Sequence, residues 1–317
     1  MAKIKSHVLE EMWAKGRKGG KLLIDSGAFS AWAKGGIEID IDLYIAFIKR
    51  YEKEIYAYIN LDVIRNPEAS WENQLYMEKK GLTPIPVFHK GEDFSWWEKY
   101  IERYDYIATG GIAGGIQTGI QQVAKHLDIC FDILCDNPDR LPSCRVHGLG
   151  VSALRLIFRY PFYSVDFTTW NVTGRLGHIY VPAMENGEYY YTVNPSKIAI
   201  SNRSPDRKIR NQHYNSMNKY NRLLIRNYVE SKGFKLGRSE FFFVNNSYKL
   251  KENEVWYTPK EEREKRTRWK VERKLELGVT NSLYARDEIN ILYFIDLQKN
   301  FKKYPWPFKK PKARYMF

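Results

Sequence analysis

The sequence lacks any apolar run long enough to cross a membrane, because no stretch approaches about 18 consecutive apolar residues. Residues 1–21 also lack the apolar core of a secretory signal peptide, so we expect none. Cysteine is scarce: the chain has only Cys130, Cys135 and Cys144, an odd and small set that is typical of a reducing compartment. These absences argue against the membrane-spanning and disulfide-rich secreted classes, and we expect a cytoplasmic protein.

The few cysteines also argue against a structural zinc site. Cys130, Cys135, Cys144 and His147 would in principle supply three thiolates and one imidazole. However, Cys130 and Cys135 lie five residues apart on a predicted helix and therefore face different directions. No tight Cys-x-x-Cys pair is present. We expect no metal and no cofactor.

Acidic residues are too few to balance the Lys and Arg that are concentrated in the last third of the chain. Residues 1–200 carry 23 Lys and Arg against 24 Asp and Glu, whereas residues 201–317 carry 28 against 13. Lys and Arg that neutralise phosphates release counterions, so this asymmetry indicates a polyanionic partner, and the interleaved Tyr, Trp and Asn favour nucleic acid. The alternative is a solvated basic surface that only keeps the protein soluble.

The alternation of apolar and helical segments predicts the fold. With 317 residues, 44% of them hydrophobic, the chain is long enough for one large domain or two ordinary ones. We expect strands at 21–29, 56–64, 83–89, 106–114, 144–151 and 162–170, and helices between them at 41–54, 67–81, 94–104 and 118–134. Such βα units imply parallel strands. Six in a row favour an α/β fold with a closed (β/α)8 TIM-type barrel over an open doubly wound sheet.

The last two barrel units are less regular. Residues 197–201 and 239–246 are the candidates for their strands, and residues 178–193 have the pattern of a hairpin with an Asn-Gly turn. Three basic segments follow, namely 203–238 with ten Lys and Arg against two acids, 259–274 as an exposed charged helix, and 301–317 as an extended or partly disordered tail. We therefore divide the chain into a barrel core at 1–202, which carries the active site, and a region at 203–317, which completes the barrel and binds nucleic acid.

Catalytic groups of parallel barrels gather at the C-terminal ends of the strands. In this sequence those ends carry Asp25, Asp62, His89, a glycine-rich loop at 110–115, His147 and Asp166. Three acids and two histidines would then share one rim. Each also has an ordinary explanation, because acids suit turns and caps, histidines bond to backbone, and glycines allow a tight turn. We interpret His147 as a hydrogen-bonded rim or core histidine, and the glycine spacing differs from a nucleotide-binding fingerprint.

Taken together, these strand ends resemble the tRNA-guanine transglycosylase superfamily, whose members exchange guanine for a 7-deazaguanine. Asp-Ser-Gly-Ala-Phe at 25–29 is similar to the Asp-Ser-Gly-Gly-Phe/Tyr motif of that family, and the loop at 110–115 is similar to its Gly-Gly-Leu-Ala-Val-Gly loop. Asp166, followed by Gly174, Arg175 and Gly177, reproduces the spacing of the motif that holds the family's nucleophile. The resemblance also includes His-Gly-Leu-Gly-Val from His147 onward, and it covers roughly residues 20–180.

The sequence departs from the family pattern in three ways. Residues 168–170 are Thr-Thr-Trp instead of Val-Leu-Pro, and His89 stands where the family usually has Gln. No cysteine follows Cys144, so the family's zinc site is absent. A compact chain without zinc resembles the phage branch, which inserts 7-deazaguanines into DNA. That placement implies DNA as partner, a free 7-deazaguanine base such as a queuosine precursor as second substrate, and the host cytoplasm if the chain is phage-encoded. Relatives often form homodimers, so we also consider one here.

The resemblance assigns a role to each motif. Asp166 would attack the sugar, and Asp25 would protonate the departing guanine and deprotonate its replacement. The residues expected around the base are Asp62, His89, Ser26, Phe29, Gly110, Gly111 and Ile112. Among them, Asp62 would accept hydrogen bonds from guanine N1 and its amino group, and Phe29 would stack on the ring.

The guanine must leave its stack to react, and phosphate contacts offset that cost. The residues expected to make them are Arg175, Arg207, Lys208, Arg210, Arg222 and Arg226. Three alternatives remain open at this point. One is the same base exchange on tRNA, the second is a barrel glycoside hydrolase that uses the same acids, and the third is a catalytically silent nucleic-acid-binding protein.

Overall fold

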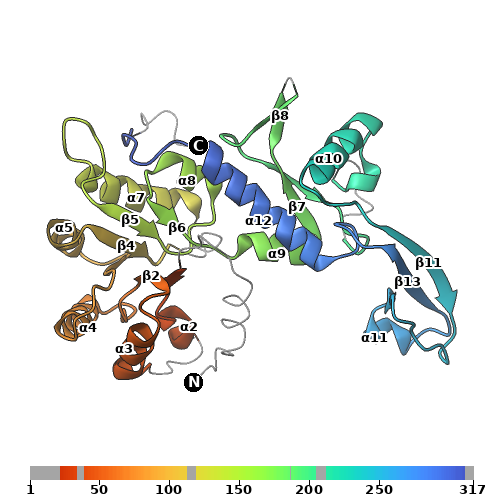
Figure 1. Cartoon of the computed structure of the whole chain (residues 1–317), viewed down its shortest axis with the longest axis horizontal. Helices are drawn as coiled ribbons and strands as arrows, with labels where there is room; N and C mark the ends of the chain where they lie inside the picture. Colours follow the sequence, from red (N-terminus) through yellow and green to blue (C-terminus); the bar gives the residue numbers. More distant parts are fainter. Residues whose placement is uncertain (1–21, 34–38, 113–118, 186, 205–211, 311–317) are drawn as a thin grey trace. The chain divides into compact units, whose positions relative to one another are not determined.

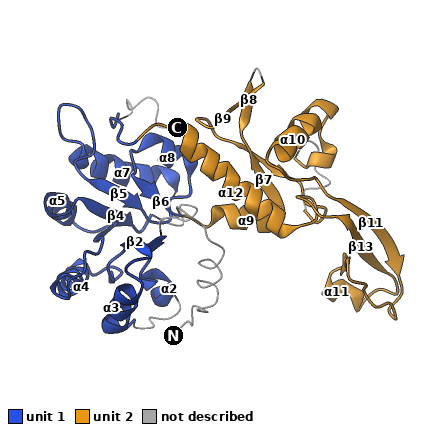
Figure 2. Cartoon of the chain, in the orientation of Figure 1, with its two compact units in different colours: residues 1–166, 304–317 blue, residues 167–303 orange. Residues whose placement is uncertain are grey.

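The computed structural model describes residues 22–33, 39–112, 119–185, 187–204 and 212–310 and has a mixed α/β fold (Figure 1). The chain divides into two compact units (Figure 2). Unit 1 comprises residues 1–166 and 304–317, and unit 2 comprises residues 167–303. Unit 2 is thus inserted into the sequence of unit 1.

Unit 1 contains the parallel strands that the sequence predicts. They are β1 (Leu22–Ile24), β2 (Ile55–Tyr58), β3 (Val87–His89), β4 (Tyr106–Gly110), β5 (Arg145–Gly148) and β6 (Ser164–Val165). β1 pairs with β2, and β3 to β6 form a second sheet in chain order. A parallel bridge between Ile59 and Ile85 joins the two sheets. All pairs are parallel, and within the described ranges these strands do not close into a barrel.

The predicted helices lie between these strands. Unit 1 contains α2 (Ala28–Ala33), α3 (Ile41–Arg50), α4 (Pro67–Lys79), α5 (Phe94–Arg103), α7 (Ile120–Leu134) and α8 (Leu154–Arg159). Local sequence fixes where several begin. Asp40 and Asp93 accept hydrogen bonds from the first backbone N–H groups of α3 and α5, and Asn66 caps α4 just before Pro67.

The two faces of the larger sheet bury different side chains. On one face, Phe88 and Ile107 pack with α5 and α7 in the main aromatic and aliphatic core. On the other face, Val87 and Ala108 join a small apolar cluster with Ile59 and Ile85. Because side chains alternate along a strand, His89 lies on the same face as Val87. This second face therefore carries the candidate site residues at its C-terminal edge.

Unit 2 is built from antiparallel strands and helices. Its elements are α9 (Thr169–Arg175), β7 (His178–Val181), β8 (Ala183–Glu185), β9 (Glu188–Tyr190), β10 (Ser196–Ala199), η2 (Tyr214–Ser216), α10 (Lys219–Ser231), β11 (Arg238–Val244), β12 (Glu254–Trp256), α11 (Lys260–Arg263), β13 (Trp269–Glu276) and α12 (Leu283–Asn300). The strands pair as β7 with β10, β8 with β9, and β11–β13–β12. A core that includes Ile179, Ile198, Tyr228 and Ile289 holds the first of these pairs to α10 and α12.

Several predictions for this half need correction. The strands expected at 197–201 and 239–246 exist as β10 and β11, but both pair antiparallel and neither extends the parallel set. The expected charged helix at 259–274 is wrong beyond its first turn, because β13 begins at Trp269. There Trp269 and Val271 alternate with charged residues, a period of two that the high charge concealed. The hairpin at 178–193 is confirmed in β8 and β9.

The basic tail returns to unit 1. Tyr304 donates a hydrogen bond to the carbonyl of Cys144, and Phe308, which is 1% exposed, packs against Phe131 and Tyr160. Residues 301–310 form neither helix nor strand, as expected of an extended segment, and 311–317 lie outside the described residues. The units therefore separate after residue 166, whereas the charge pattern placed a boundary at 202.

Within the described residues, no helix combines the length and the apolar character that a membrane crossing requires.

Candidate active site

A buried polar cluster forms where β2 and β3 end. Asp62, 7% exposed, accepts a hydrogen bond from the Ser26 hydroxyl at 2.9 Å. Its other oxygen lies 3.0 Å from Nε2 of His89. Glu92 holds His89 from the opposite side, with 3.3 Å between Oε1 and Nδ1, and also accepts the backbone N–H of His89 at 2.9 Å. The structure thus brings Ser26, Asp62 and His89 together, as the sequence predicts.

The protonation state of His89 follows from this cluster. Burial disfavours the charged imidazolium, but the hydrogen bonds to Asp62 and Glu92 outweigh burial and raise the pKa of His89 to about 9. Near neutral pH both ring nitrogens therefore carry protons and donate. Asp62 is fixed by two donors, and its remaining lone pairs are the ones that a bound ligand would use.

Asp166 lies at the end of β6 in a different environment. Its carboxylate accepts the backbone N–H of Gly150 at 2.9 Å and lies 3.2 Å from Nε2 of His147. Loss of hydration disfavours its charge, yet these hydrogen bonds prevail and hold the pKa of Asp166 below its usual value. The side chain is 57% exposed, and in the described part of the chain no Lys or Arg pairs with it. Asp166 is therefore an ionised and accessible carboxylate.

Asp25 shows the opposite shift. It follows β1 and is exposed to solvent, so the loss of hydration that is the largest cause of its raised pKa is only partial. The negative charges of Asp62 and Asp166 raise the pKa of Asp25 further, so the three carboxylates are electrostatic neighbours. The pKa values of these two acids therefore shift in opposite directions: the surroundings favour the protonated form of Asp25 and the ionised form of Asp166. Such a pair can divide acid and nucleophile roles between them.

A chain of hydrogen bonds stands behind Asp166. The Ser164 hydroxyl lies 2.7 Å from Nδ1 of His147 and 2.6 Å from the hydroxyl of Tyr106. An ionised Asp166 can only accept, so the Nε2 that faces it must carry a proton. In a neutral imidazole Nδ1 then accepts from Ser164, which in turn accepts from Tyr106. The chain therefore fixes the tautomer of His147 that donates to Asp166.

The glycine-rich loop begins in close contact with His89. A Cβ atom on Gly110 would lie 3.0 Å from Cδ2 of His89, and Gly111 has a positive φ of 68°. Larger residues at these two positions would crowd the imidazole or strain the backbone. Ile112 is 5% exposed in the main core, so its side chain does not line the site. Residues 113–118 lie outside the described ranges.

Phe29 lies on α2, close in sequence to Asp25. Its ring is 59% exposed and lies 6.1 Å from that of Trp32, which Arg65 approaches to 5.5 Å. This exposed aromatic pair has the surface that a stacking ligand would need.

Comparison of the chain with protein-family models, with curated proteins and with solved structures found no match.

The Gly-Arg-x-Gly segment has a packing role in unit 2. A Cβ atom on Gly174 would lie 2.0 Å from the Asp287 carboxylate, and the Gly174 carbonyl accepts a hydrogen bond from Arg286. Gly177 has a φ of 87° and leaves no room for a Cβ beside Ser201. Both glycines are therefore required by close packing. Their spacing after Asp166 does not by itself indicate chemistry.

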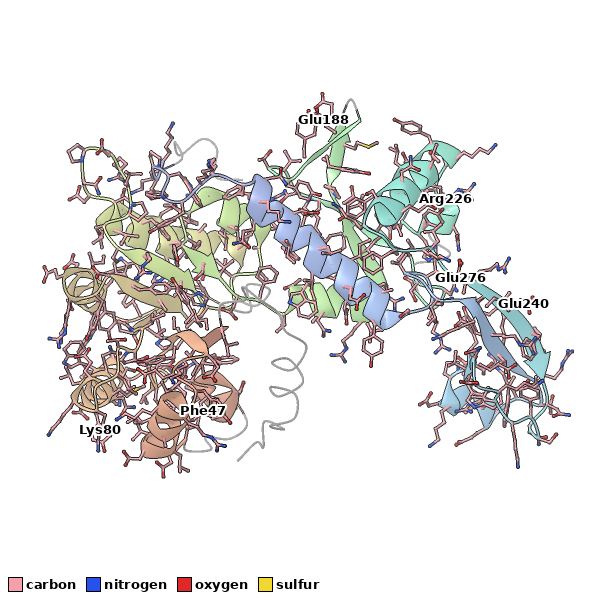
Figure 3. All side chains as sticks on the ribbon, in the orientation of Figure 1. Phe47, Lys80, Glu188, Arg226, Glu240 and Glu276 are labelled. Carbon is pink, nitrogen blue, oxygen red and sulfur yellow. The ribbon has the colours of Figure 1, made fainter. Side chains whose placement is uncertain are left out.

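The basic residues predicted to contact nucleic acid all belong to unit 2. Arg175 is exposed at the end of α9, Arg226 is exposed on α10 (Figure 3), and Arg222 is half-buried. Arg207, Lys208 and Arg210 lie outside the described residues. Nothing in the structure tests whether any of them contacts phosphate.

The three cysteines are buried free thiols. Burial raises the pKa of Cys135 and of Cys144 to about 12, and that of Cys130 also rises. A zinc ligand must be a thiolate, which such burial disfavours. His147 bonds to Ser164 and Asp166 instead. In the described ranges, no group of three or more His, Cys, Asp or Glu side chains is placed to hold a metal ion.

Sequence reasoning missed the partners of the site histidines. Glu92 follows His89 by three residues in the turn before α5, and Ser164 precedes Asp166 by two at the end of β6. The second spacing places both side chains on one side of a strand, a signal that the sequence offered. His147 is 2% exposed and bonds to Ser164 and Asp166, which confirms its interpretation as a hydrogen-bonded rim or core histidine.

Proposed function

We propose that this chain exchanges guanine in DNA for a 7-deazaguanine base through a covalent intermediate between Asp166 and the sugar. The exposed Asp166 carboxylate, held by His147 and the Gly150 N–H without a basic partner in the described residues, carries the proposal, and the raised pKa of nearby Asp25 supports it. Base exchange needs one carboxylate that stays ionised and one that donates and accepts a proton, and this rim contains such a pair.

The reaction divides into two displacements. In the first, a carboxylate oxygen of Asp166 bonds to C1′ while the bond from C1′ to guanine breaks, and Asp25 gives its proton to the departing base. In the second, Asp25 takes a proton from the incoming base, whose nitrogen bonds to C1′ as the bond to Asp166 breaks. Throughout, the His147 N–H stabilises the charge that leaves and returns on Asp166.

The polar cluster supports selection of a guanine-like base. Asp62 has lone pairs beyond those used by Ser26 and His89, and these would accept from guanine N1–H and its amino group. His89 donates its two ring N–H groups to Asp62 and Glu92, so it would act on the base by orienting the Asp62 carboxylate. Backbone of Gly110 and Gly111 would approach the other edge of the ring.

The same proposal includes a (β/α)8 barrel. β1 pairs with β2, and β3 to β6 pair in chain order, which supports the first six units, because a doubly wound sheet reverses its strand order part-way. The strands that would complete the barrel are not β10 and β11, which pair antiparallel. The net charge of +14, concentrated in the last third, supports a nucleic-acid substrate over a simple sugar. Charge does not separate DNA from tRNA. The resemblance of the motifs without zinc ligands to the phage branch places DNA first, with tRNA as the alternative acceptor.

Labelled guanine, offered with duplex DNA or with bulk tRNA, tests the proposal. We expect label to enter DNA with the wild type, and Asp166→Asn to lower the rate by at least about 10³-fold, since the nucleophile is lost. Asp93→Asn, which changes an exposed helix cap of unit 1, is the matched control and should keep the wild-type rate.

The intermediate gives a second readout. Denaturing gels of wild type mixed with DNA should show a covalent protein–DNA species that Asp166→Asn does not form. If label enters only tRNA, the acceptor is tRNA instead of DNA, and the proposed mechanism is unchanged. Absence of both exchange and adduct, with guanine and with 7-deazaguanine bases, would contradict the proposal.

A further inference from the structure

The sheet β11–β13–β12 has two unlike faces. Trp256 and Trp269 pack edge to face on one of them, beside Tyr248, and form a local core. Side chains alternate along each strand, so Phe241 and Phe243 lie on the other face, and Phe243 is 58% exposed. The strands that carry this face are labelled in Figure 1, and Glu240 and Glu276 mark β11 and β13 in Figure 3.

Cations surround the exposed ring. Arg268 lies 5.3 Å from the centre of Phe243, and Lys270 is the cross-strand neighbour of Phe243. Lys270 also lies 4.8 Å from the ring of Phe241. Within the described part of the chain, neither Arg268 nor Lys270 forms an ion pair. We call Phe243, Arg268 and Lys270 the aromatic–basic face.

Glu272 lies on this face, and its carboxylate is already hydrogen-bonded to other side chains. Glu272 is 1% exposed and accepts hydrogen bonds from Ser239 at 2.8 Å, Asn202 at 3.1 Å and Arg203 at 3.3 Å. It therefore does not neutralise the two free cations. The same contacts anchor Arg203, the first residue of the basic segment 203–238, to this sheet. Two basic features that are separate in the sequence thus meet in unit 2.

We propose that the aromatic–basic face binds nucleic acid, with Arg268 and Lys270 against phosphates and Phe243 stacked on an unpaired base. An exposed ring flanked by unpaired cations has the chemistry that single strands require, since rings stack with any base and cations follow the backbone. The inference rests on the proposed function for the class of its partner, and it adds a contact surface outside the catalytic unit.

Fluorescence anisotropy of the full chain with a labelled single strand and its duplex, across about 50 to 200 mM salt, tests this face. Arg268→Gln/Lys270→Gln should weaken binding and reduce the slope of log K against log salt on duplex DNA by about 1.8, or about 0.9 for each phosphate lost. Phe243→Ala should weaken single-strand binding by about tenfold and leave the slope unchanged.

Matched controls separate the face from general effects. Lys249→Gln/Lys251→Gln removes the same charge from the exposed turn of this sheet, and Tyr284→Ala removes a ring that is 80% exposed on α12. Both should bind like the wild type. Equal affinity and slope in the face variants, or equal losses in the controls, would overturn the inference.

The binding assay also separates this inference from base exchange. If the face variants lose binding while the wild type exchanges no base, the result supports nucleic-acid binding by the aromatic–basic face and contradicts the proposed function. If the wild type exchanges base and the face variants bind normally, the result supports the proposed function and contradicts nucleic-acid binding by the aromatic–basic face. A wild type that binds no nucleic acid overturns both.

Discussion

At the scale of single residues, neighbours decide what each acid of unit 1 can do. Asp166 is surrounded by donors, His147 Nε2 and the Gly150 N–H, and its pKa falls. Asp25 loses part of its hydration and has two carboxylates near it, and its pKa rises. The amino acid is the same in both places, so the surroundings alone set the two pKa values in opposite directions.

This difference predicts a pH dependence. The first displacement needs Asp166 ionised and Asp25 protonated, so kcat should rise as pH passes the lowered pKa of Asp166 and fall above the raised pKa of Asp25. Asp62→Asn removes a charge that raises the pKa of Asp25. The falling limb of the kcat profile should then move to lower pH.

Carboxyl-carbon NMR titration of Asp25 checks the cause directly. Its pKa should fall in Asp62→Asn and stay in place in the control Asp93→Asn, which alters an acid at the start of α5. An unchanged Asp25 titration in Asp62→Asn would show that the neighbouring charge has little influence.

At the scale of elements, two glycines with similar backbone angles allow a matched comparison. Gly177 has a φ of 87° and packs against Ser201, whereas Gly233 has a φ of 79° at the end of α10 with open space around it. Gly233→Ala should cost about 1 kcal/mol through backbone strain alone. Gly177→Ala should cost that amount and about 1–3 kcal/mol more, because the methyl group collides with Ser201.

Urea unfolding of both variants, followed by circular dichroism, measures the difference. Equal midpoints would mean that α9 and the Ser201 loop adjust around the methyl group without strain. In that case the packing role that we assign to Gly177 would be wrong.

The sequence predicted the elements of unit 1 well and those of unit 2 less well. Runs such as the one that contains Ile107 and Ala108 are apolar on both faces, which is typical of buried parallel strands. β13 carries its apolar residues on one face among charges, so a helix seemed equally suitable for residues 259–274. The pairing of β10 and β11 depends on distant partners that local pattern does not encode.

The candidate site shows the same division. Asp25, Asp62, His89 and Asp166 could be found because strand ends of parallel sheets share one edge. The roles of Ser164 and Tyr106 could not, because they depend on which hydroxyls meet across β4, β5 and β6. The side chain of Ile112 enters the core, because it is apolar and directly follows the buried strand β4.

At the scale of the whole molecule, the chain leaves unit 1 after Asp166 and returns at Tyr304. Phe308→Ala should destabilise unit 1 by about 3–5 kcal/mol, because a fully buried ring between Phe131 and Tyr160 is lost. Lys309→Ala, an exposed change in the same tail, should have little effect.

Hydrogen exchange with mass spectrometry resolves the two units. Peptides of β4 and β5 should lose protection in Phe308→Ala, while peptides of β7 and α12 keep theirs. Equal loss in both sets would indicate that the units unfold as one, and no loss in either would show that the tail contributes nothing to stability.

The return of the tail also has a consequence for biosynthesis. The ribosome makes the chain from residue 1 onward, so all of unit 2 is synthesised before Tyr304 and Phe308 emerge. Until then the pocket between Phe131 and Tyr160 is open, and the rim of carboxylates belongs to an incomplete unit. Products of translation interrupted before Tyr304 would therefore expose aromatic surface and be targets for chaperones and proteases, so completion of unit 1 depends on synthesis of the tail.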